Sequence, residues 1–344
     1  MKMDDRKLKI LQAVIADYIT TAQPIGSRTI AKKYELGISS ATIRNEMSDL
    51  EEMGFLEQPH TSAGRIPSER AYRLYVDRLM KIKKLTEEEQ TAIMAELGNR
   101  ADEIENIIRK TVKILSHLTR YTSLAMSSQL DDCRLRHIHF VPIDSNSLVA
   151  VIVTDSGIVK NTIIKTADTV TPDYLESLTK VVNEIFQGAT VEELNSSVAS
   201  EDFRRYAYRY RLLDNLIPLI VDSLEEKKCD EVYADGMRNI FNFPEYSDVS
   251  RARNLLALIE DKEQLAGLIN RIAGKGVKVS IGSELDNENI RDCSLVTATY
   301  RVGDKEIGKI GIIGPTRMEY ARVVAIMGFM ADQITCLIKK QLGE

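Results

Sequence analysis

The chain has 344 residues, of which 44% are hydrophobic and 28% charged, with a net charge of −5. This length predicts about two or three folded domains, and the composition excludes a disordered or fibrous protein. The apolar runs are shorter than about 18 residues, which excludes a membrane span, and the charged N-terminus excludes a secretory signal. The four cysteines are scattered and include no CxxC pair, which excludes a disulfide framework. We therefore expect a cytoplasmic protein with reduced thiols and no membrane partner.

The charge is unevenly distributed along the chain. Residues 1–84 contain 15 Lys and Arg against 11 Asp and Glu, whereas the remainder contains 31 against 40. The N-terminal part therefore has a net charge of +4 and the rest a net charge of −9. A basic module on an acidic body is typical of a polyanion-binding domain joined to a part that does not bind.

The first 53 residues have the pattern of a helix-turn-helix. The first predicted helix ends before Pro24 and places Leu8, Leu11, Ile15, Tyr18 and Ile19 on one stripe. A second starts at Ser27, the expected N-cap, and ends near Gly37, which suits a left-handed turn. A third runs from Ser39 or Ser40 to Met53. Two short helices joined by a turn containing Gly form a helix-turn-helix.

The third helix has one apolar face and one polar face. At roughly 100° per residue, Ile43, Met47, Leu50 and Met53 share the buried face. Acidic residues are confined to its last turn, and the N-terminal end of a recognition helix is the part that docks in the major groove. We expect Arg44 to read guanine, Asn45 adenine, and Ala41 or Thr42 a thymine methyl. The full set of predicted reading residues is Ser39, Ser40, Ala41, Thr42, Arg44, Asn45 and Ser48.

Residues 55–68 alternate, turn and return, which predicts a β-hairpin wing. We expect the wing tip to contact phosphates or the minor groove through His60, Thr61, Ser62 and Arg65, and the second helix to add Ser27 and Arg28. Ser68 is the expected cap of a further helix. Its inward residues would be Ala71, Leu74, Tyr75 and Leu79, and its outward residues Arg70, Arg73, Lys81 and Lys84. Winged helices also occur as protein-interaction modules, so a scaffold that does not bind DNA remains an alternative.

The motifs "SSATIRN" at residues 39–45 and "HTSAGRIPS" at residues 60–68, preceded by "PIGS" at residues 24–27, closely resemble those of the HrcA family of heat-inducible transcription repressors. The resemblance extends more diffusely over the rest of the chain. It implies a homodimeric repressor of chaperone operons that binds an inverted-repeat double-stranded DNA operator called CIRCE. It also implies a winged helix, a GAF-like domain with a dimerising insert, and control through the availability of chaperonin during heat stress.

The rest of the chain predicts an α+β multidomain protein. Thr86 and Glu89 form a capping box before a helix ending near Gly98, and a helix over residues 100–121 has heptad-like spacing. Strand patterns at 136–165 and 276–314 predict one antiparallel sheet, and helices are expected at 172–186 and 316–341. The expected domains are the winged helix-turn-helix (1–84), connector helices and the first GAF-like part (85–190), a mainly helical dimerisation insert (191–275) and the second GAF-like part (276–344).

Other residue groups are weaker candidates. Cys133, His137 and His139 have no zinc-ligand spacing, and Thr316 with Arg317 would hold an anion only at a helix start. Tyr206, Tyr208 and Tyr210 are better explained as interface packing. The sequence contains no nucleophile motif, so we expect no enzyme, metal or cofactor. A winged-helix repressor controlled by a small metabolite in the GAF-like domain is the alternative function.

Overall fold

The computed structural model describes residues 3–60, 63–98, 104–127, 134–144, 146–154, 159–166, 170–190, 193–194, 196, 213, 216, 218–220, 231–272, 274, 276–303 and 305–342. The chain divides into two compact units. The first consists of Met1–Ser127 with Val232–Ile338, and the second of Ser128–Glu231 with Lys339–Glu344.

The N-terminal part of the first unit, residues 3–80, is a winged helix-turn-helix that we call the head. Its elements are α1 (Asp5–Thr21), α2 (Ser27–Lys33), α3 (Ser40–Glu52), β1 (Leu56–Glu57), β2 (Ile66–Pro67), α4 (Glu69–Leu74) and a π-turn, η1 (Tyr75–Leu79). Most buried side chains of α1, α2 and α3 are apolar and recur at helical spacing, so the three helices share one core, and the buried charged residues are Lys7 and Asp17 of α1. The buried stripe of α1 is formed by Ile10, Leu11, Val14 and Ile15, whereas Leu8, Tyr18 and Ile19 are only partly buried.

The rest of the first unit, which we call the body, is built on a five-stranded sheet with the order β7-β3-β10-β9-β8. Its strands are β3 (Thr122–Ser127), β7 (Glu231–Asp235), β8 (Val277–Ile281), β9 (Cys293–Val302) and β10 (Lys305–Pro315). The pairs β3–β10, β10–β9 and β9–β8 are antiparallel. The chain turns between β9 and β10 at Gly303, which has a φ of 59°, a left-handed conformation that favours glycine.

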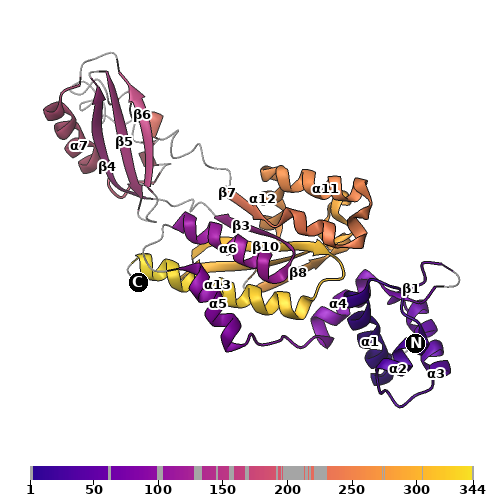
Figure 1. The fold of residues 1–344 in the computed structure, drawn as a ribbon. Helices are drawn as coiled ribbons and strands as arrows, with labels where there is room; N and C mark the ends of the chain where they lie inside the picture. The colour runs from indigo at the N-terminus through magenta and orange to yellow at the C-terminus, as the bar shows by residue number, and fades with distance from the viewer. Residues whose placement is uncertain are drawn as a thin grey trace. The chain divides into compact units, whose positions relative to one another are not determined.

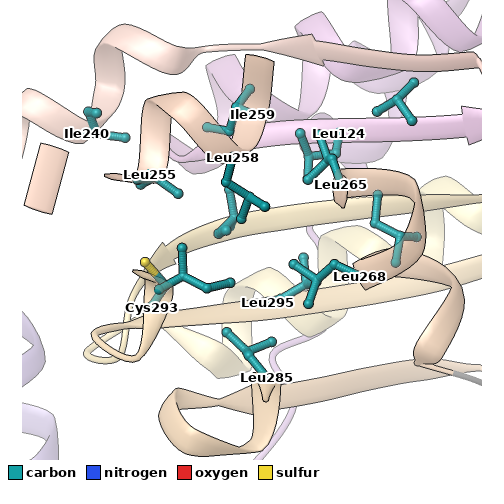
Figure 2. Packing of buried hydrophobic residues seen from close by; sticks show 14 of the residues in the cluster. Leu124, Ile240, Leu255, Leu258, Ile259, Leu265, Leu268, Leu285, Cys293 and Leu295 are labelled. Atoms are coloured by element: carbon teal, nitrogen blue, oxygen red, sulfur yellow. The ribbon is translucent and has the colours of Figure 1, made fainter. Parts of the chain in front are cut away.

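Helices cover both faces of this sheet (Figure 1). On one face, α11 (Val249–Glu260) and α12 (Lys262–Arg271) bury leucine and isoleucine side chains against β9 and β3, as Figure 2 shows for Leu255, Leu258, Leu265 and Leu295. Short 3-10 segments complete this layer: η2 (Met237–Asn242), η3 (Pro244–Ser247), η4 (Gly282–Leu285) and η5 (Glu288–Ile290). The helices α5 (Glu87–Leu97) and α6 (Ile104–Thr119) pack against each other, and α6 packs on β3.

The helix α13 (Tyr320–Leu342) covers the other face. Hydrogen bonds attach it at both ends of β9: the hydroxyls of Ser294 and Tyr320 share one of 2.7 Å, and the Arg301 amide donates to the Thr335 hydroxyl at 3.2 Å. Among the described residues, α13 is the helix that is long and apolar enough by composition to cross a membrane, contrary to our expectation from the sequence. Because its residues Ile326, Met327, Met330 and Ile334 are buried in the body, we interpret α13 as a core helix.

The second unit contains a separate three-stranded antiparallel sheet, β4-β5-β6. Its strands are β4 (Leu135–Asp144), β5 (Ser147–Thr154) and β6 (Val159–Lys165), and α7 (Pro172–Phe186) packs against β4. Alternate residues of β5, Leu148, Ala150 and Ile152, are fully buried in a core with α7, Leu194, Leu213, Leu216 and Ile220. The Asn183 side chain accepts from the Ile138 amide at 2.8 Å and donates to the Ile138 carbonyl at 2.7 Å, which attaches α7 to the sheet.

The expectation of one sheet is therefore wrong. The strands at 135–165 pair with one another and form their own core, so they belong to the inserted unit rather than to the five-stranded sheet. Conversely, α11 and α12 pack on the five-stranded sheet, although both fall within the insert predicted at 191–275. An alternating or helical pattern of apolar residues identifies a strand or a helix. It does not show which other strand or sheet that element packs against.

Candidate nucleic-acid interface

The recognition helix α3 has the polarity that the sequence predicts. Ser39 is its N-cap, in an extended conformation, and its hydroxyl accepts from the Thr42 amide at 3.1 Å. Ile43 and Leu50 are fully buried and Met47 is 4% exposed, so this stripe anchors α3 in the head. The opposite face therefore faces outward along the length of the helix.

The predicted reading residues lie on this outward face. Ser39, Ala41, Arg44, Asn45 and Ser48 are exposed, and Ser40 and Thr42 are partly buried. The hydroxyls of Ser39 and Thr42 lie 2.9 Å apart and share a hydrogen bond, so the cap also orients the threonine side chain. The first turn of α3 contains no acidic residue. Its free amide groups and short polar side chains provide a surface that suits phosphates and base edges.

Two acidic residues of α3 form ion pairs with basic residues of α1 inside the head. Lys7 of α1 contacts Glu46 at 2.7 Å and Asp49 at 3.1 Å, and Arg6 contacts Glu46 at 3.4 Å. Hydrogen bonds to Glu46 and then to Asp49 raise the pKa of the Lys7 ammonium group. The sequence did not reveal this role of Lys7, because the pattern of α1 gives no sign that a lysine on its buried side meets two carboxylates of α3.

The wing is short, and Arg65 lies between its loop and β2. In the wing, Leu56 pairs with Pro67 and Glu57 with Ile66. Arg65 exchanges two backbone hydrogen bonds of 2.9 Å with Ile25, and its guanidinium donates to Glu51 at 2.8 Å. Arg65 thus lies where the wing loop meets β2, and its side chain pairs with a third acidic residue of α3. His60 is exposed near the tip, and the predicted residues Thr61 and Ser62 lie outside the described residues.

The start of α2 differs by one residue from the prediction. Gly26, not Ser27, is its N-cap, and the Gly26 carbonyl accepts from the amides of Thr29 at 3.0 Å and Ile30 at 3.3 Å. Ser27 is therefore the first helical residue and is partly buried, while Arg28 is exposed beside it. Gly37 has a φ of 68°, as its predicted left-handed turn requires, but α2 already ends at Lys33.

The arginines of α4 do not form one exposed row. Ser68 caps α4 as predicted, but the buried residues of α4 are Ala71 and Tyr72. Arg70 donates to the Met53 carbonyl at 3.0 Å and lies over the Phe55 ring, so it holds the C-terminal end of α3. Arg73 points to the body, where it donates to Glu284 and to the Val279 carbonyl at 2.6 Å. A charge pattern alone shows which side chains lie outside the core of the head. It does not show which other part of the protein they contact.

The remaining candidates do not form a metal or anion site among the residues that the structure describes. No group of three His, Cys, Asp or Glu is placed to hold a metal ion there. His137 and His139 are exposed on one face of β4, and Cys133 lies outside the described residues, as do Tyr206, Tyr208 and Tyr210. Arg317 is 7% exposed and is bound to Glu245, which excludes the anion site considered for it.

Comparisons with known proteins cover both parts of the chain. A model of the winged helix-turn-helix transcription repressor HrcA DNA-binding domain matches residues 3–81, and a model of the HrcA protein C-terminal domain matches residues 105–324. The chain is 47% identical over 347 residues to the heat-inducible transcription repressor HrcA of Ruminiclostridium cellulolyticum, covering 100% of both chains. It is 44% identical over 341 residues to the HrcA of Pelotomaculum thermopropionicum, covering 99% of this chain and 98% of that one.

A solved structure supports the fold. A crystal structure of a hypothetical protein at 2.2 Å resolution is similar, with a TM-score of 0.72, 25% sequence identity, and coverage of 99% of this chain and 100% of that chain. The matched residues include "SSATIRN" and "HTSAGRIPS", the motifs that carry the resemblance in the sequence. The chain belongs to the HrcA family of heat-inducible transcription repressors.

Proposed function

We propose that this protein is a homodimeric repressor of chaperone operons that binds the inverted-repeat CIRCE operator and is released from it during heat stress through the availability of chaperonin. The single observation that supports DNA reading most directly is the outward face of α3. It combines exposed Arg44 and Asn45 with a capped, acid-free N-terminal turn, while the buried stripe holds the helix in place. The chaperonin step rests on family membership.

The proposed docking places the N-terminal half of α3 in the major groove. Arg44 would donate two hydrogen bonds to guanine, Asn45 would pair with adenine, and Ala41 with the Thr42 methyl would contact thymine. The ion pairs of Glu46, Asp49 and Glu51 reduce the repulsion that phosphates would meet along α3. Ser27, Arg28 and the wing residues His60, Thr61 and Ser62 remain proposed backbone or minor-groove contacts.

For homodimerisation, we propose the outer face of the three-stranded sheet as the surface that binds a second copy. The inward face of this sheet packs on its own core, whereas Val159 and Ile163 of β6 are 63% and 67% exposed. Val149 of β5 pairs with both Ile163 and Val141, which gives a continuous apolar row across the three strands. A second copy is the chosen occupant because an inverted repeat needs two heads related by symmetry, and one face can meet itself across a two-fold axis.

The dimer proposal is tested by Ile163→Lys in the full chain. A charge in the centre of the apolar row would have to be buried on association, so we expect the variant to sediment as a monomer and to lose most of its affinity for the inverted repeat. Val249→Lys is the matched control, because Val249 is 69% exposed on α11 of the body, which belongs to the other compact unit. A dimeric Ile163→Lys variant that binds the operator normally would refute this surface.

Operator binding itself is tested by gel shift on a CIRCE duplex against a duplex with scrambled half-sites. Preference for the intact repeat is expected from the repressor and excludes a scaffold that does not bind DNA. Repeating the titration with and without chaperonin across temperature tests the control mechanism. An operator affinity that does not depend on chaperonin at any temperature would remove that part of the proposal.

A metabolite-controlled repressor is the second candidate, and one observation favours it. The body contains a pocket of about 290 Å³ that is lined by Leu268, Arg271, Ile272, Ser280, Glu284, Leu285 and Asp286. The five-stranded sheet with helices on both faces also supports the expected GAF-like description of the body. A rise in melting temperature with a small-molecule ligand, together with a change in operator affinity, would favour this candidate. As a DNA-binding repressor, the protein would act in the cytoplasm.

A further inference from the structure

A buried arginine of the body is attached to the head. Arg317 precedes α13 and is 7% exposed, and its guanidinium donates to the Ile19 carbonyl at 2.9 Å. Ile19 lies in the last turn of α1, where carbonyl groups have no partner within the helix. The same guanidinium binds the carboxylate of Glu245 through two nitrogens, one at 3.1 Å, and lies 5.4 Å from the centre of the Phe243 ring.

A second polar contact joins α4 to the loop after β8. Arg73 donates to Glu284 at 2.8 Å through Nε and to the Val279 carbonyl at 2.6 Å. Glu69 accepts from the Ser283 hydroxyl at 2.6 Å and from the Ser283 amide at 3.1 Å. Gly282 of this loop has a φ of 55°, a left-handed conformation that favours glycine, and a Cβ atom there would also lie 2.0 Å from the Glu69 carboxylate.

Between these two polar contacts lies an aromatic one. The rings of Tyr72 from α4 and Tyr320 from α13 have centres 6.0 Å apart and are tilted by 55°. Tyr72 is 2% exposed and Tyr320 fully buried, so the joint excludes water at its centre. The head is thus attached to the body through α1 and α4, whereas α3 and the wing take no part in these contacts.

We propose that Arg317 is a positioning residue for operator recognition: from the body it fixes the direction in which α3 points, and so determines the half-site spacing that the two heads of a dimer accept. This inference rests on the proposed homodimer and inverted repeat. A rigid joint raises the effective concentration of the second head at its half-site only when the spacing fits. A loosened joint lowers that concentration but lets the heads reach repeats with other spacings.

The planar guanidinium is essential to this role. It binds the Glu245 carboxylate in two places and still reaches a carbonyl of α1, because arginine has five donors in a fixed plane. A lysine at this position keeps the positive charge beside Glu245 but offers a single ammonium group, which cannot replace the planar array. Arg317→Lys should therefore loosen the joint without leaving an unpaired buried carboxylate.

The test compares Arg317→Lys with Arg73→Lys, which weakens the second contact at a side chain that is 30% exposed and so is less at risk of misfolding. The control is Arg291→Lys, because Arg291 pairs with Glu288 at 3.1 Å on the body surface and both side chains are exposed. Each full-length variant is titrated with a single half-site, with the intact inverted repeat, and with repeats whose spacer is shortened or lengthened. Circular dichroism melts check that each variant is folded.

We expect folded Arg317→Lys to bind the single half-site like wild type, to bind the intact repeat at least about 10-fold more weakly, and to discriminate less between spacers. Arg73→Lys should show the same pattern, and Arg291→Lys should match wild type. Unchanged spacer discrimination in both joint variants would overturn the proposal, as would equal losses on the half-site and the repeat. If wild type itself does not prefer the repeat over the half-site, the proposed dimeric repressor fails instead.

Discussion

Replacing Gly64 with alanine should separate the wing from the first loop of the head. A Cβ atom at Gly64 would lie 2.5 Å from the carbonyl carbon and oxygen of Ile25 and 2.8 Å from its nitrogen. These are backbone atoms, so no side-chain rotation relieves the clash. The neighbouring residue Arg65 exchanges two backbone hydrogen bonds of 2.9 Å with the same Ile25. The glycine in "TSAGR" is therefore required by this close approach.

The size of the effect follows from this geometry. Reaching ordinary contact from 2.5 Å requires the two backbones to move apart by about 1 Å. That movement breaks or weakens both hydrogen bonds, each worth about 0.5–1.5 kcal/mol net. We expect Gly64→Ala to lower the free energy of unfolding of the head by about 1–3 kcal/mol, which is also the usual range for overpacking.

The assay is urea denaturation of the full chain, combined with hydrogen exchange at the amides of Ile25 and Arg65. Gly26→Ala is the matched control in the same domain, because Gly26 has a φ of −92° and a Cβ there meets no atom within 4 Å. We expect the control to cost about 1 kcal/mol or less, the usual range for an N-cap change. Wild-type protection of both amides in Gly64→Ala, with an unchanged urea midpoint, would refute the reasoning.

Other predictions concern the reading residue, the neutralised acid and a buried thiol. Arg44→Ala should weaken operator binding by about 1–3 kcal/mol and relax discrimination at one base pair, and an unchanged preference in competition gel shifts would contradict our docking of α3. Glu51→Gln should tighten binding to all sequences and steepen the salt dependence, because it removes a negative charge and releases Arg65, which is 2.8 Å away. A salt slope equal to that of wild type would argue that Arg65 stays away from phosphates. Burial raises the pKa of Cys293 to about 12, so the folded state keeps a proton that the unfolded thiol loses near pH 8.5. Stability should therefore fall as the pH rises above about 8.5, and less steeply in Cys293→Ala, as measured by urea midpoints at several pH values.

The sequence by itself determined much of the local structure of the head, including which face of α3 points outward. The apolar spacing of Ile43, Met47 and Leu50 fixes the buried side of α3, and Ser39 fixes its start, because both signals act within a few residues. The capping box of Thr86 with Glu89 and the helix at 172–186 were predicted for the same reason. The motifs around these elements also indicated the family.

Only the tertiary structure decided which elements share a sheet and which charges meet. Two strands with the same alternating pattern can join either sheet, so the separate sheet β4-β5-β6 could not be predicted from alternation. The ion pairs Lys7–Glu46, Arg73–Glu284 and Arg317–Glu245 join residues that lie 39 or more positions apart in the chain, and neither spacing nor composition encodes such pairs. Ion pairs of this kind depend on how whole elements dock, which is set by the packing of the apolar cores rather than by the charged residues themselves.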